Sequence, residues 1–465
     1  MPFIRSISRR TFLTGLPRAV ATAAVPLVIP SSALGLAGLV APSKRVTMGL
    51  IGCGGHGVGW NLPQIFRNPD EQVIAVCDVD ESRMMGAKAA VEKHYSNVLG
   101  RDYKGCTTYG DFRELVNRKD IDTVDNCTPD HWHVIPAIMA AKAGKDVICE
   151  KPLTLTVGEG RILCKVVQET GRIFQTASEN RSIDTYIHLC ELVRNGRIGK
   201  LRHIEVTLPI GGTTRGENFT QRDAQPVPKG FNYEMWLGQA PLAPYCPARC
   251  HGSFRWNRDY SGGTLTDWGA HMIDLAQWGN DTEKTGPVEV EGKGDFPPRE
   301  ALFNVAPTFD LHYKYANGVT LRVSSSEPGI RFVGSEGWIG FENWRGPLQA
   351  SNPKILKSKI GPDEIHLYRP SEIVARTEGG KGGEHRNFLD CVKSRQPCYA
   401  PAETGHRTVT IAHVGNIAMV LGRKLRWDPE AEQFVDDPEA DKMLSRKQRE
   451  PWTIGNVESW IKKNA

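Results

Sequence analysis

Three side chains of this 465-residue chain have the types and spacing needed to move a proton and hold a charge. Lys151 stands in VICEKPL (147–153), where an apolar run ends in a carboxylate, an ammonium and a proline. Asp267 and His271 stand four residues apart in GGTLTDWGAHMIDLAQW (262–278). A histidine can take the proton of a hydroxyl, and an ammonium stabilises an oxygen that gains negative charge. These residues are candidate catalytic groups, although a surface ion pair in a tight turn would explain the lysine motif equally well.

The segment that holds Asp267 and His271 has the composition of a helix entered through two glycines, with Thr266 expected as its N-cap. Positions 267, 271, 274 and 278 fall on one face of such a helix. Polar residues on an otherwise buried helix must face a site or each other. We therefore predict His271 as a general base, Asp267 as the group that orients it or binds a substrate hydroxyl, and Asp274 as a substrate contact. A histidine satisfied within the core is the alternative.

A glycine loop after the first apolar strand predicts a dinucleotide site. It fits G-x-G-x-x-G and comprises Gly52, Gly54, Gly55, His56 and Gly57. The loop opens a helix, and Asp78 ends the next strand, 21 residues after Gly57. Such glycines allow a tight turn close to a pyrophosphate, and the acid binds the ribose hydroxyls. Asp78 would repel a 2′-phosphate, so NAD is favoured over NADP. Only the nearby Arg83 favours NADP. A glycine turn without a cofactor is the alternative.

Strands alternate with helices from Val46 to about Gly171, which indicates a parallel sheet covered on both faces. Ligands bind beyond the carboxyl ends of the strands in such a sheet. The residues expected there, and therefore near the cofactor, are Thr128, Pro129, His133, Glu150 and Lys151. This position explains why the strand before Lys151 stops on two charges.

Longer β-rich runs follow, and Ala316-Asn-Gly318 is a good hairpin turn between two of them. The fold class is therefore α/β, with an N-terminal Rossmann domain and a C-terminal α/β domain built on a large, open, mostly antiparallel sheet. We predict a signal peptide at 1–42, the Rossmann domain at 43–178, a substrate and oligomerisation domain at 179–426, and a surface tail at 427–465.

The N-terminus has the order of a twin-arginine export signal. SRRTFL (8–13) precedes an apolar stretch, 19–29, and small residues, 31–41. We predict export to the periplasm, with a disordered cytosolic tail as the alternative. The apolar stretch is too short for a membrane span, and we expect no stable membrane insertion. Four arginines and no acid lie in residues 1–40, so the remaining chain is close to neutral and we expect no nucleic-acid partner.

The eleven cysteines show no repeated C-x-x-C, and most lie in apolar runs where cysteine behaves as a small hydrophobe. We predict no metal site. Only Cys246 and Cys250 are placed to form a disulfide, which an oxidising compartment would permit.

These motifs together resemble the glucose-fructose oxidoreductase/inositol dehydrogenase (Gfo/Idh/MocA) family, and most closely its exported members. Further matching motifs are TPDHWH (128–133), AGKDVICEKPL (143–153), GRIGKLRHIEV (196–206), GSEGWI (334–339) and HRNFLDCVKSRQP (385–397). The resemblance implies that Lys151 and Asp267 position a sugar and that His271 is the base. It also implies a homo-oligomer, a dimer or tetramer. Additional candidate substrate contacts are Arg181, Trp236, Arg255 and Trp256, although packing roles are equally open for them.

Three functions follow from these features. The leading one is NAD-dependent oxidation of a secondary hydroxyl of a sugar, glycoside or cyclitol. The second is a redox-neutral glycosidase or epimerase that oxidises a sugar carbon only transiently. The third is a non-catalytic nucleotide- or sugar-binding protein, which would not need Lys151, Asp267 and His271. Because export removes the protein from the NAD pool, we further expect the cofactor to be loaded before export and to stay bound.

Overall fold

The computed structural model describes residues 40–212, 219–367 and 383–462. The chain divides into a short unit, Met1–Arg45, and a main unit, Val46–Ala465. The described part of the short unit contains one 3-10 turn, Pro42–Lys44. The predicted signal peptide therefore lies almost wholly outside the described residues, and its assignment remains a prediction.

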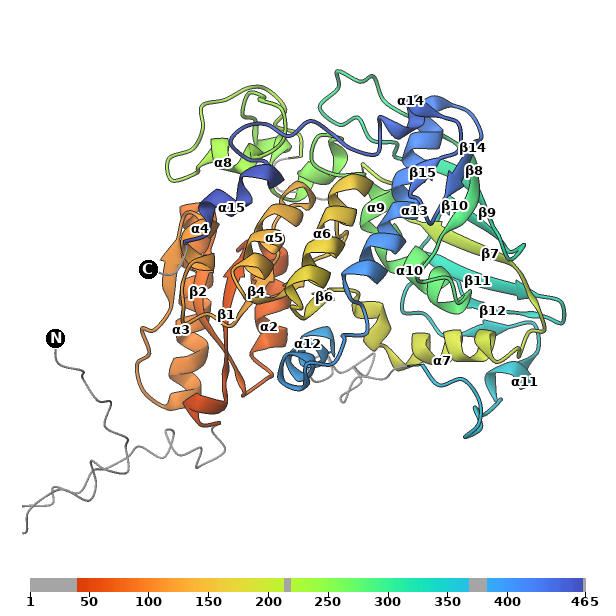
Figure 1. Cartoon of the computed structure of the whole chain (residues 1–465), viewed down its shortest axis with the longest axis horizontal. Helices are drawn as coiled ribbons and strands as arrows, with labels where there is room; N and C mark the ends of the chain where they lie inside the picture. Colours follow the sequence, from red (N-terminus) through yellow and green to blue (C-terminus); the bar gives the residue numbers. More distant parts are fainter. Residues whose placement is uncertain (1–39, 213–218, 368–382, 463–465) are drawn as a thin grey trace, which may run out of the picture. The chain divides into compact units, whose positions relative to one another are not determined.

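A six-stranded parallel sheet forms the first half of the main unit (Figure 1). In sheet order its strands are β3 (Thr107–Tyr109), β2 (Glu71–Cys77), β1 (Val46–Ile51), β4 (Thr123–Asn126), β5 (Asp146–Cys149) and β6 (Phe174–Thr176). The chain order reverses between β1 and β4, which is the arrangement of a dinucleotide-binding Rossmann domain and confirms the predicted fold. The helices of this half are α2 (Leu62–Ile65), α3 (Glu81–Leu99), α4 (Phe112–Val116), α5 (Val134–Lys142) and α6 (Val157–Thr170).

Helices cover both faces of this sheet, as its apolar strands require. Val147 and Cys149 of β5 belong to a core shared with α4, α5 and α6, whereas Ile148 points to the opposite core with α2 and α3. Local signals define the helix ends. Thr156 and Glu159 form a capping box at the start of α6, and Gly171 ends that helix in the left-handed conformation.

A nine-stranded sheet forms the second half. In sheet order its strands are β13 (Gln349–Ala350), β12 (Trp338–Phe341), β11 (Gly329–Gly334), β7 (Leu201–Leu208), β10 (Thr320–Ser325), β9 (Phe309–Tyr315), β8 (Pro287–Gly294), β14 (Leu425–Asp428) and β15 (Gln433–Phe434). Only the β7–β10 pair is parallel, so the prediction of a mostly antiparallel sheet is confirmed. Gly318, at φ 86°, makes the predicted turn between β9 and β10.

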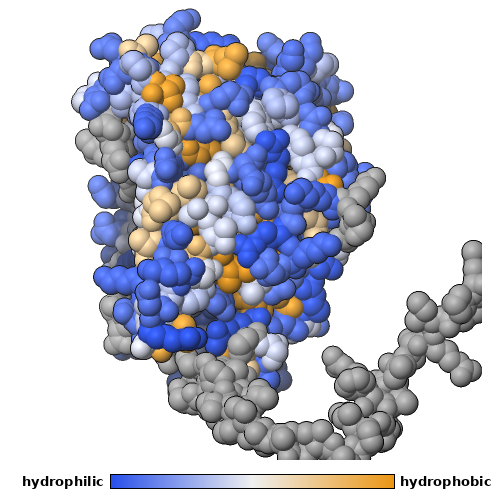
Figure 2. Space-filling view, turned by 90° about the vertical axis from the view of Figure 1, so that its left-hand side faces the viewer, coloured by the Kyte–Doolittle hydropathy of each residue, from blue (hydrophilic) through white to orange (hydrophobic). Residues whose placement is uncertain are grey.

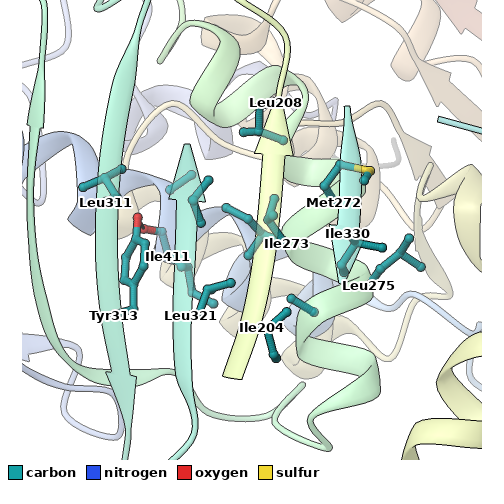
Figure 3. Close-up of a cluster of buried hydrophobic side chains, with 14 of the residues drawn as sticks. Ile204, Leu208, Met272, Ile273, Leu275, Leu311, Tyr313, Leu321, Ile330 and Ile411 are labelled. Carbon is teal, nitrogen blue, oxygen red and sulfur yellow. Dashed lines mark hydrogen bonds between the residues drawn. The ribbon is translucent and has the colours of Figure 1, made fainter. Parts of the chain in front are cut away.

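The helices of the second half are α7 (Asp184–Arg194), α8 (Tyr233–Leu237), α9 (Thr264–Asp267), α10 (Gly269–Gly279), α11 (Pro353–Leu356), α12 (Gly383–Ser394), α13 (Ala402–Leu421), α14 (Pro438–Asp441) and α15 (Val457–Trp460). Of these, α7, α10 and α13 pack on one face of the nine-stranded sheet, whereas α12 and α15 contact the Rossmann half. Figure 3 shows how α10 and α13 fill the core, with Ile273 and Ile411 facing Leu321 and Tyr313 of the sheet. The opposite face of the sheet is polar, because alternate strand residues point to it.

Late segments of the chain return to the Rossmann half. Phe388 of α12 joins the core below β5 and β6, and Trp452 and Val457 join the core around α5. The predicted tail boundary, 427, falls within β14. The segment after it is thus partly buried against the first sheet rather than lying only on the surface.

The face seen in Figure 2 is mostly hydrophilic, with hydrophobic residues in separate small patches. Among the described residues, no helix has both the length and the apolar character required to span a bilayer.

Candidate functional site

A cavity of about 340 Å³ lies beyond the carboxyl ends of β1, β2, β4 and β5. Its Rossmann wall includes the glycine loop, Asp78, Thr128, Glu150 and Lys151. Its other wall comes from the second half and includes Phe231, Met235, Trp236, Phe254 and Arg255. The cavity therefore occupies the position between β1 and β4 at which open parallel sheets bind dinucleotides.

The glycine loop fits a pyrophosphate. Gly52 has φ 96°, and a Cβ atom there would lie 2.3 Å from the carbonyl oxygen of Cys127. A Cβ atom on Gly57 would lie 2.3 Å from the carbonyl oxygen of Gly52, whereas one on Gly55 would meet nothing within 4 Å. The loop is thus tightly folded against β4 and open toward the cavity, as close approach of a phosphate requires.

Asp78 ties this loop to the next strand. Its carboxylate accepts hydrogen bonds from the backbone N–H groups of Cys53 (2.6 Å) and Asp80 (2.9 Å). Burial raises the pKa of Asp78 to about 6, so the group is mostly ionised at neutral pH. Its remaining lone pairs can accept the ribose hydroxyls of a bound dinucleotide.

His56 and Glu150 connect the loop to the end of β5. His56 Nε2 lies 3.1 Å from Glu150 Oε1. Burial alone would raise the pKa of Glu150, but the charge and hydrogen bond of His56 hold it at about 2. The charge of Glu150 in turn raises the pKa of His56. The two predicted cofactor contacts thus form one ion pair inside the cavity.

Lys151 joins the two halves of the site. Its Nζ lies 2.7 Å from Asp267 Oδ1, although the two residues are 116 positions apart. Arg255 Nε lies 3.4 Å from the same oxygen. Burial would raise the pKa of Asp267, but Lys151 and Arg255 together hold it well below its usual range. Asp267 is therefore a fixed anion between two cations.

His271 stands one helical turn after Asp267. Burial and, next, the charge of Lys151 lower the pKa of His271 to about 3, so its imidazole is neutral at neutral pH. Its buried Nδ1 has no hydrogen-bond partner among the described residues. The arrangement is a neutral base beside an ammonium, which is the pair that removing a hydroxyl proton needs.

Thr128 and His133 shape the end of β4. The two ring nitrogens of His133 lie 2.7 Å from the carbonyl oxygen of Pro152 and 2.8 Å from that of Thr128. Both residues line the cavity, as does Pro129. His133 thus links the strand ends that carry Thr128 and Lys151, and its predicted place near the cofactor agrees with the geometry.

Arg181 and Asp274 do not face this cavity. Arg181 is 1 % exposed and makes two hydrogen bonds to Asp274, at 2.7 and 2.8 Å, and one to Glu283 at 2.5 Å. Trp278 lies against its guanidinium at 4.8 Å. The predicted polar stripe therefore has two separate partners. Asp267 pairs with Lys151, whereas Asp274 pairs with Arg181 inside the protein. The geometry does not support substrate contacts for Arg181 or Asp274.

The two tryptophans predicted as substrate contacts lie in different places. Trp236 lines the cavity, while its predicted contact with a substrate stays a prediction. Trp256 is buried, 4 % exposed, and does not line it.

Thr266 is not the N-cap, because α9 begins at Thr264 after Gly263, which has φ 74°. The glycine can take that backbone conformation without strain, so the helix starts earlier than the side-chain pattern suggests.

Four residues beside His271 escaped the sequence analysis. Asn180 donates to the carbonyl oxygen of His271 at 3.2 Å, and Trp344 lies 5.8 Å from the His271 ring. Arg345 stacks on Trp344 at 4.3 Å and donates to Glu179 at 3.1 Å. Glu179 and Asn180 belong to the segment in which only Arg181 was selected. Nothing local marks Trp344 or Arg345, since β12 and the turn after it bring them to the site.

No disulfide joins any of the eleven cysteines, all of which lie among the described residues, so the possible Cys246–Cys250 disulfide is absent. No group of three or more metal-ligating side chains occurs among residues 40–212, 219–367 and 383–462.

Two family descriptions match the chain. "Oxidoreductase family, NAD-binding Rossmann fold" covers residues 46–178, and "Oxidoreductase family, C-terminal alpha/beta domain" covers residues 192–348 and 377–454. The chain belongs to the Gfo/Idh/MocA oxidoreductase family. Because the glycine loop and Asp78 fit a dinucleotide, we assign NAD to the first domain of this family member.

Two curated relatives of this Gfo/Idh/MocA protein match part of the chain. It is 33 % identical over 160 residues to an uncharacterized oxidoreductase, ORF334, of Rhizobium meliloti, covering 34 % of this chain and 44 % of the relative. It is 31 % identical over 187 residues to glycosyl hydrolase family 109 protein 2 of Shewanella sp. (strain ANA-3), covering 40 % and 39 %. The chain thus spans less than half the length of these curated relatives.

Solved structures of the same architecture cover more of the chain. Levoglucosan dehydrogenase, in complex with NADH and L-sorbose, superposes with a TM-score of 0.57 over 82 % of this chain and 99 % of that one. At 18 % identity, this likeness establishes the fold alone.

Proposed function

We propose that this protein is an NAD-dependent oxidoreductase that oxidises a secondary hydroxyl of a sugar, glycoside or cyclitol. The observation that carries the proposal is the Lys151–Asp267 contact at 2.7 Å at the end of α9, with neutral His271 in the first turn of the next helix, α10. This group adjoins the dinucleotide cavity, because Lys151 belongs to both.

Each of the three residues has a distinct part in this reaction. His271 takes the hydroxyl proton, since its imidazole is neutral. Lys151 donates to the substrate oxygen and stabilises the charge that develops there, because an ammonium has three donors and Asp267 uses only part of them. Asp267 holds Lys151 in place and accepts from a neighbouring hydroxyl. The nicotinamide of bound NAD supplies the hydride acceptor.

The surroundings of His271 suit a sugar ring. The ring centroids of Trp268 and Trp344 lie 6.1 and 5.8 Å from that of His271. Indole faces stack on the apolar faces of sugars, and Arg345 and Glu179 offer groups for hydroxyls. We infer that this aromatic and polar corner receives the substrate.

The decisive experiment follows NADH formation by absorbance with a panel of sugars, methyl and aryl glycosides and inositols. We expect reduction of NAD with at least one secondary alcohol, and its loss in His271→Asn. Lys93→Ala, at an exposed site away from the cavity, is the matched control. Absence of both NADH formation and product from every substrate would contradict an enzymatic function and leave a binding protein.

Glu179 favours a second candidate, a redox-neutral glycosidase or epimerase. Burial and then the charge of Glu384 raise the pKa of Glu179 to about 7, so this group can both give and take a proton. Simple oxidation needs one base, whereas elimination and addition beside a transient ketone need a second acid–base group. The relative named glycosyl hydrolase family 109 protein 2 is consistent with this chemistry.

The two candidates differ in their products. A redox-neutral enzyme cleaves or epimerises its substrate in proportion to time without accumulating NADH. Glu179→Gln should then abolish product release but still allow a single reduction of the bound cofactor. An enzyme that forms one NADH for each substrate oxidised is a simple dehydrogenase.

We also propose export by the twin-arginine route to the periplasm. The support is the order of SRRTFL, the apolar stretch and the small residues in the sequence. Replacing Arg9 and Arg10 with lysine should leave the folded protein in the cytoplasmic fraction. An unchanged distribution between fractions would contradict the proposal.

Assembly into a dimer or tetramer is proposed through the polar face of the nine-stranded sheet. That face carries ordered charge pairs across strands, such as Arg322 with Asp310 at 2.8 Å. Charges of both signs on this face can pair with the same face of a second copy. Light scattering after size exclusion should give a dimer or tetramer, and a monomer would refute the proposal.

A further inference from the structure

We propose that a second cavity of this protein binds an anionic ligand carrying a phosphate or sulfate ester group. The cavity has a volume of about 550 Å³. It lies between the start of α6, the loop before α9, the loop after β8, α13 and the segment after α14. It shares no lining residue with the dinucleotide cavity, so such a ligand would bind in addition to NAD.

Four cationic side chains line this cavity: Arg258, Arg299, Lys442 and Arg446. The single acidic side chain of its lining is Asp259. Within the described part of the chain, none of the four cations lies within 4.0 Å of a carboxylate. Arg258 is half-buried, whereas Arg299, Lys442 and Arg446 are exposed. The cavity therefore gathers four cations around one acidic side chain.

The three guanidinium groups lie close enough to repel one another. Burial and the charge of Arg299 lower the pKa of Arg258. Burial and the charge of Arg258 lower the pKa of Arg446. Like charges held close together repel one another, and a bound anion would neutralise that repulsion. The arrangement is thus one that a bound anion would stabilise.

The cations are held by structure rather than by one flexible loop. The backbone N–H of Arg258 donates to Asn304 at 2.8 Å, and the Asn304 amide donates to the carbonyl oxygen of Arg299 at 3.0 Å. Arg446 donates through its guanidinium to the carbonyl oxygen of Arg258. Phe296 packs against the Arg258 guanidinium at 5.3 Å. Three separate chain segments are therefore tied together around the charges.

The composition of the cavity indicates the kind of ligand. Arginine forks match the oxygens of phosphate and sulfate with paired hydrogen bonds. Apolar side chains, Val305, Ile417 and Val420, lie on the same lining and can contact an organic body. His413, in the cavity wall, contributes no charge at neutral pH, because burial lowers its pKa to about 3. A phosphate or sulfate ester of a polyol fits this combination better than an inorganic anion alone or a purely apolar ligand.

The cavity is also joined to the proposed catalytic residues through the chain. Leu155 and Thr156 of its wall follow Lys151 by four and five positions, and Gly262 precedes Asp267 by five. The anionic group could therefore belong to the substrate or to a separate small molecule. Both share the same recognition chemistry, and the experiment distinguishes them.

The test is calorimetric titration of the full chain, saturated with NAD and at constant ionic strength, with inorganic phosphate and with glucose 6-phosphate. Saturation with NAD keeps phosphate from the glycine loop. We expect saturable binding of at least one probe, weakened about tenfold or more in Arg299→Gln and in Arg446→Gln, since each loses a charge-assisted pair. Lys447→Gln, exposed and outside the cavity, should bind as the wild type does.

Two results would overturn the proposal: no saturable binding of either probe, or equal binding by Arg299→Gln and Lys447→Gln. Tighter binding of glucose 6-phosphate than of phosphate, with its oxidation or conversion by the protein, would assign the group to the substrate. Binding of either probe without conversion would assign it to a separate ligand. The outcome does not depend on the proposed oxidation, because binding is measured directly.

Discussion

The ammonium of Lys151 lies 2.7 Å from the carboxylate of Asp267, so the end of β5 in the first sheet is bonded to the helix that precedes α10. Lys151 is 12 % and Asp267 4 % exposed, measured on their side chains. Because both charges are largely removed from water, separating them would leave a buried charge unpaired, which holds the two groups together. The contact joins a residue of the dinucleotide cavity to the carboxylate that precedes His271 of α10.

Lys151→Ala should lower kcat by about 10²–10³, because the developing negative charge on the substrate oxygen loses its donor. Lys151→Arg should remain strongly impaired, since a planar fork cannot replace a point charge in a tight site. Steady-state kinetics on the substrate identified by the panel measures both effects.

Lys93→Ala is the control for these lysine variants, and unfolding curves of each variant verify the fold. Wild-type kcat in Lys151→Ala would exclude a catalytic role for this lysine.

The pH dependence of kcat/KM should lack the acidic decline of an ordinary histidine. The pKa of His271 is lowered from 6.5 to about 3 by burial and by Lys151, so the imidazole stays neutral and able to accept a proton as pH falls below 6.5. In His271→Asn, kcat should fall by roughly 10²–10⁴ at every pH. A pH–rate profile of both proteins tests this.

His312→Asn, on the exposed face of the nine-stranded sheet, should behave as the wild type. A decline of kcat/KM centred near pH 6.5 that disappears in His271→Asn would show that His271 titrates as a free histidine.

Asp78 should make NAD the preferred cofactor, and this preference should weaken in acid. Burial raises the pKa of Asp78 from 3.8 to about 6, so its repulsion of a 2′-phosphate is present above that pH and fades as pH falls through it. Asp78→Asn should reduce the ratio of NAD to NADP affinity at neutral pH. Fluorescence titration with NADH and NADPH measures the ratio.

The control is Asp102→Asn, an exposed acid outside the cavity, which should leave the ratio unchanged. Equal affinity of the wild type for NADH and NADPH would mean that Asp78 does not select the cofactor.

Arg181→Ala should destabilise the protein by about 3–5 kcal/mol, because it leaves the buried Asp274 without its cation. Arg181→Met together with Asp274→Leu should recover much of that loss, since neither charge of the buried pair remains and the side chain of Glu283 is 23 % exposed. Urea unfolding measures the free energies.

Arg322→Ala removes an exposed pair with Asp310 and should change stability little. If Arg181→Ala instead keeps full stability and raises KM alone, Arg181 contacts substrate after all.

The protein should be purified with NAD(H) already bound, at about one molecule per chain, if export requires a retained cofactor. A Kd of about 1 nM corresponds to roughly −12 kcal/mol and to slow release at ordinary association rates. Purification without nucleotide, extensive dialysis, denaturation and chromatography of the supernatant give the stoichiometry.

Far less than one NAD(H) per chain, with activity that depends on added NAD, would show a freely exchanging cofactor. In that case the proposed export would leave the protein dependent on an outside supply.

Short-range patterns were sufficient to predict the two sheets and most of the site. The glycine loop, Asp78 and Lys151 were found because each depends on its own strand end, and the order of parallel strands brings strand ends together. Asp267 and His271 were found because helical periodicity places residues four apart on one face. The long β-rich runs and the turn at Gly318 similarly predicted the second sheet.

Long-range contacts decided the remaining features. Asp274 shares the helical face of His271 but meets Arg181, and no local pattern indicates which partner a buried carboxylate will find. Trp344 and Arg345 reach His271 only because β12 pairs with β11 in one register. The free Cys246 and Cys250 could likewise be established only by the fold.

The sequence by itself therefore determined the chemistry available to this protein: a dinucleotide loop, a lysine at a strand end and a histidine on a helix. The tertiary structure alone decided which of these groups meet, that Lys151 is held by Asp267, and that Arg258, Arg299 and Arg446 surround a second cavity. The physical reason is that side-chain type and local periodicity are encoded within a few residues. Burial and charge pairing depend instead on segments far apart in the chain, with 116 positions between Lys151 and Asp267 and 93 between Arg181 and Asp274.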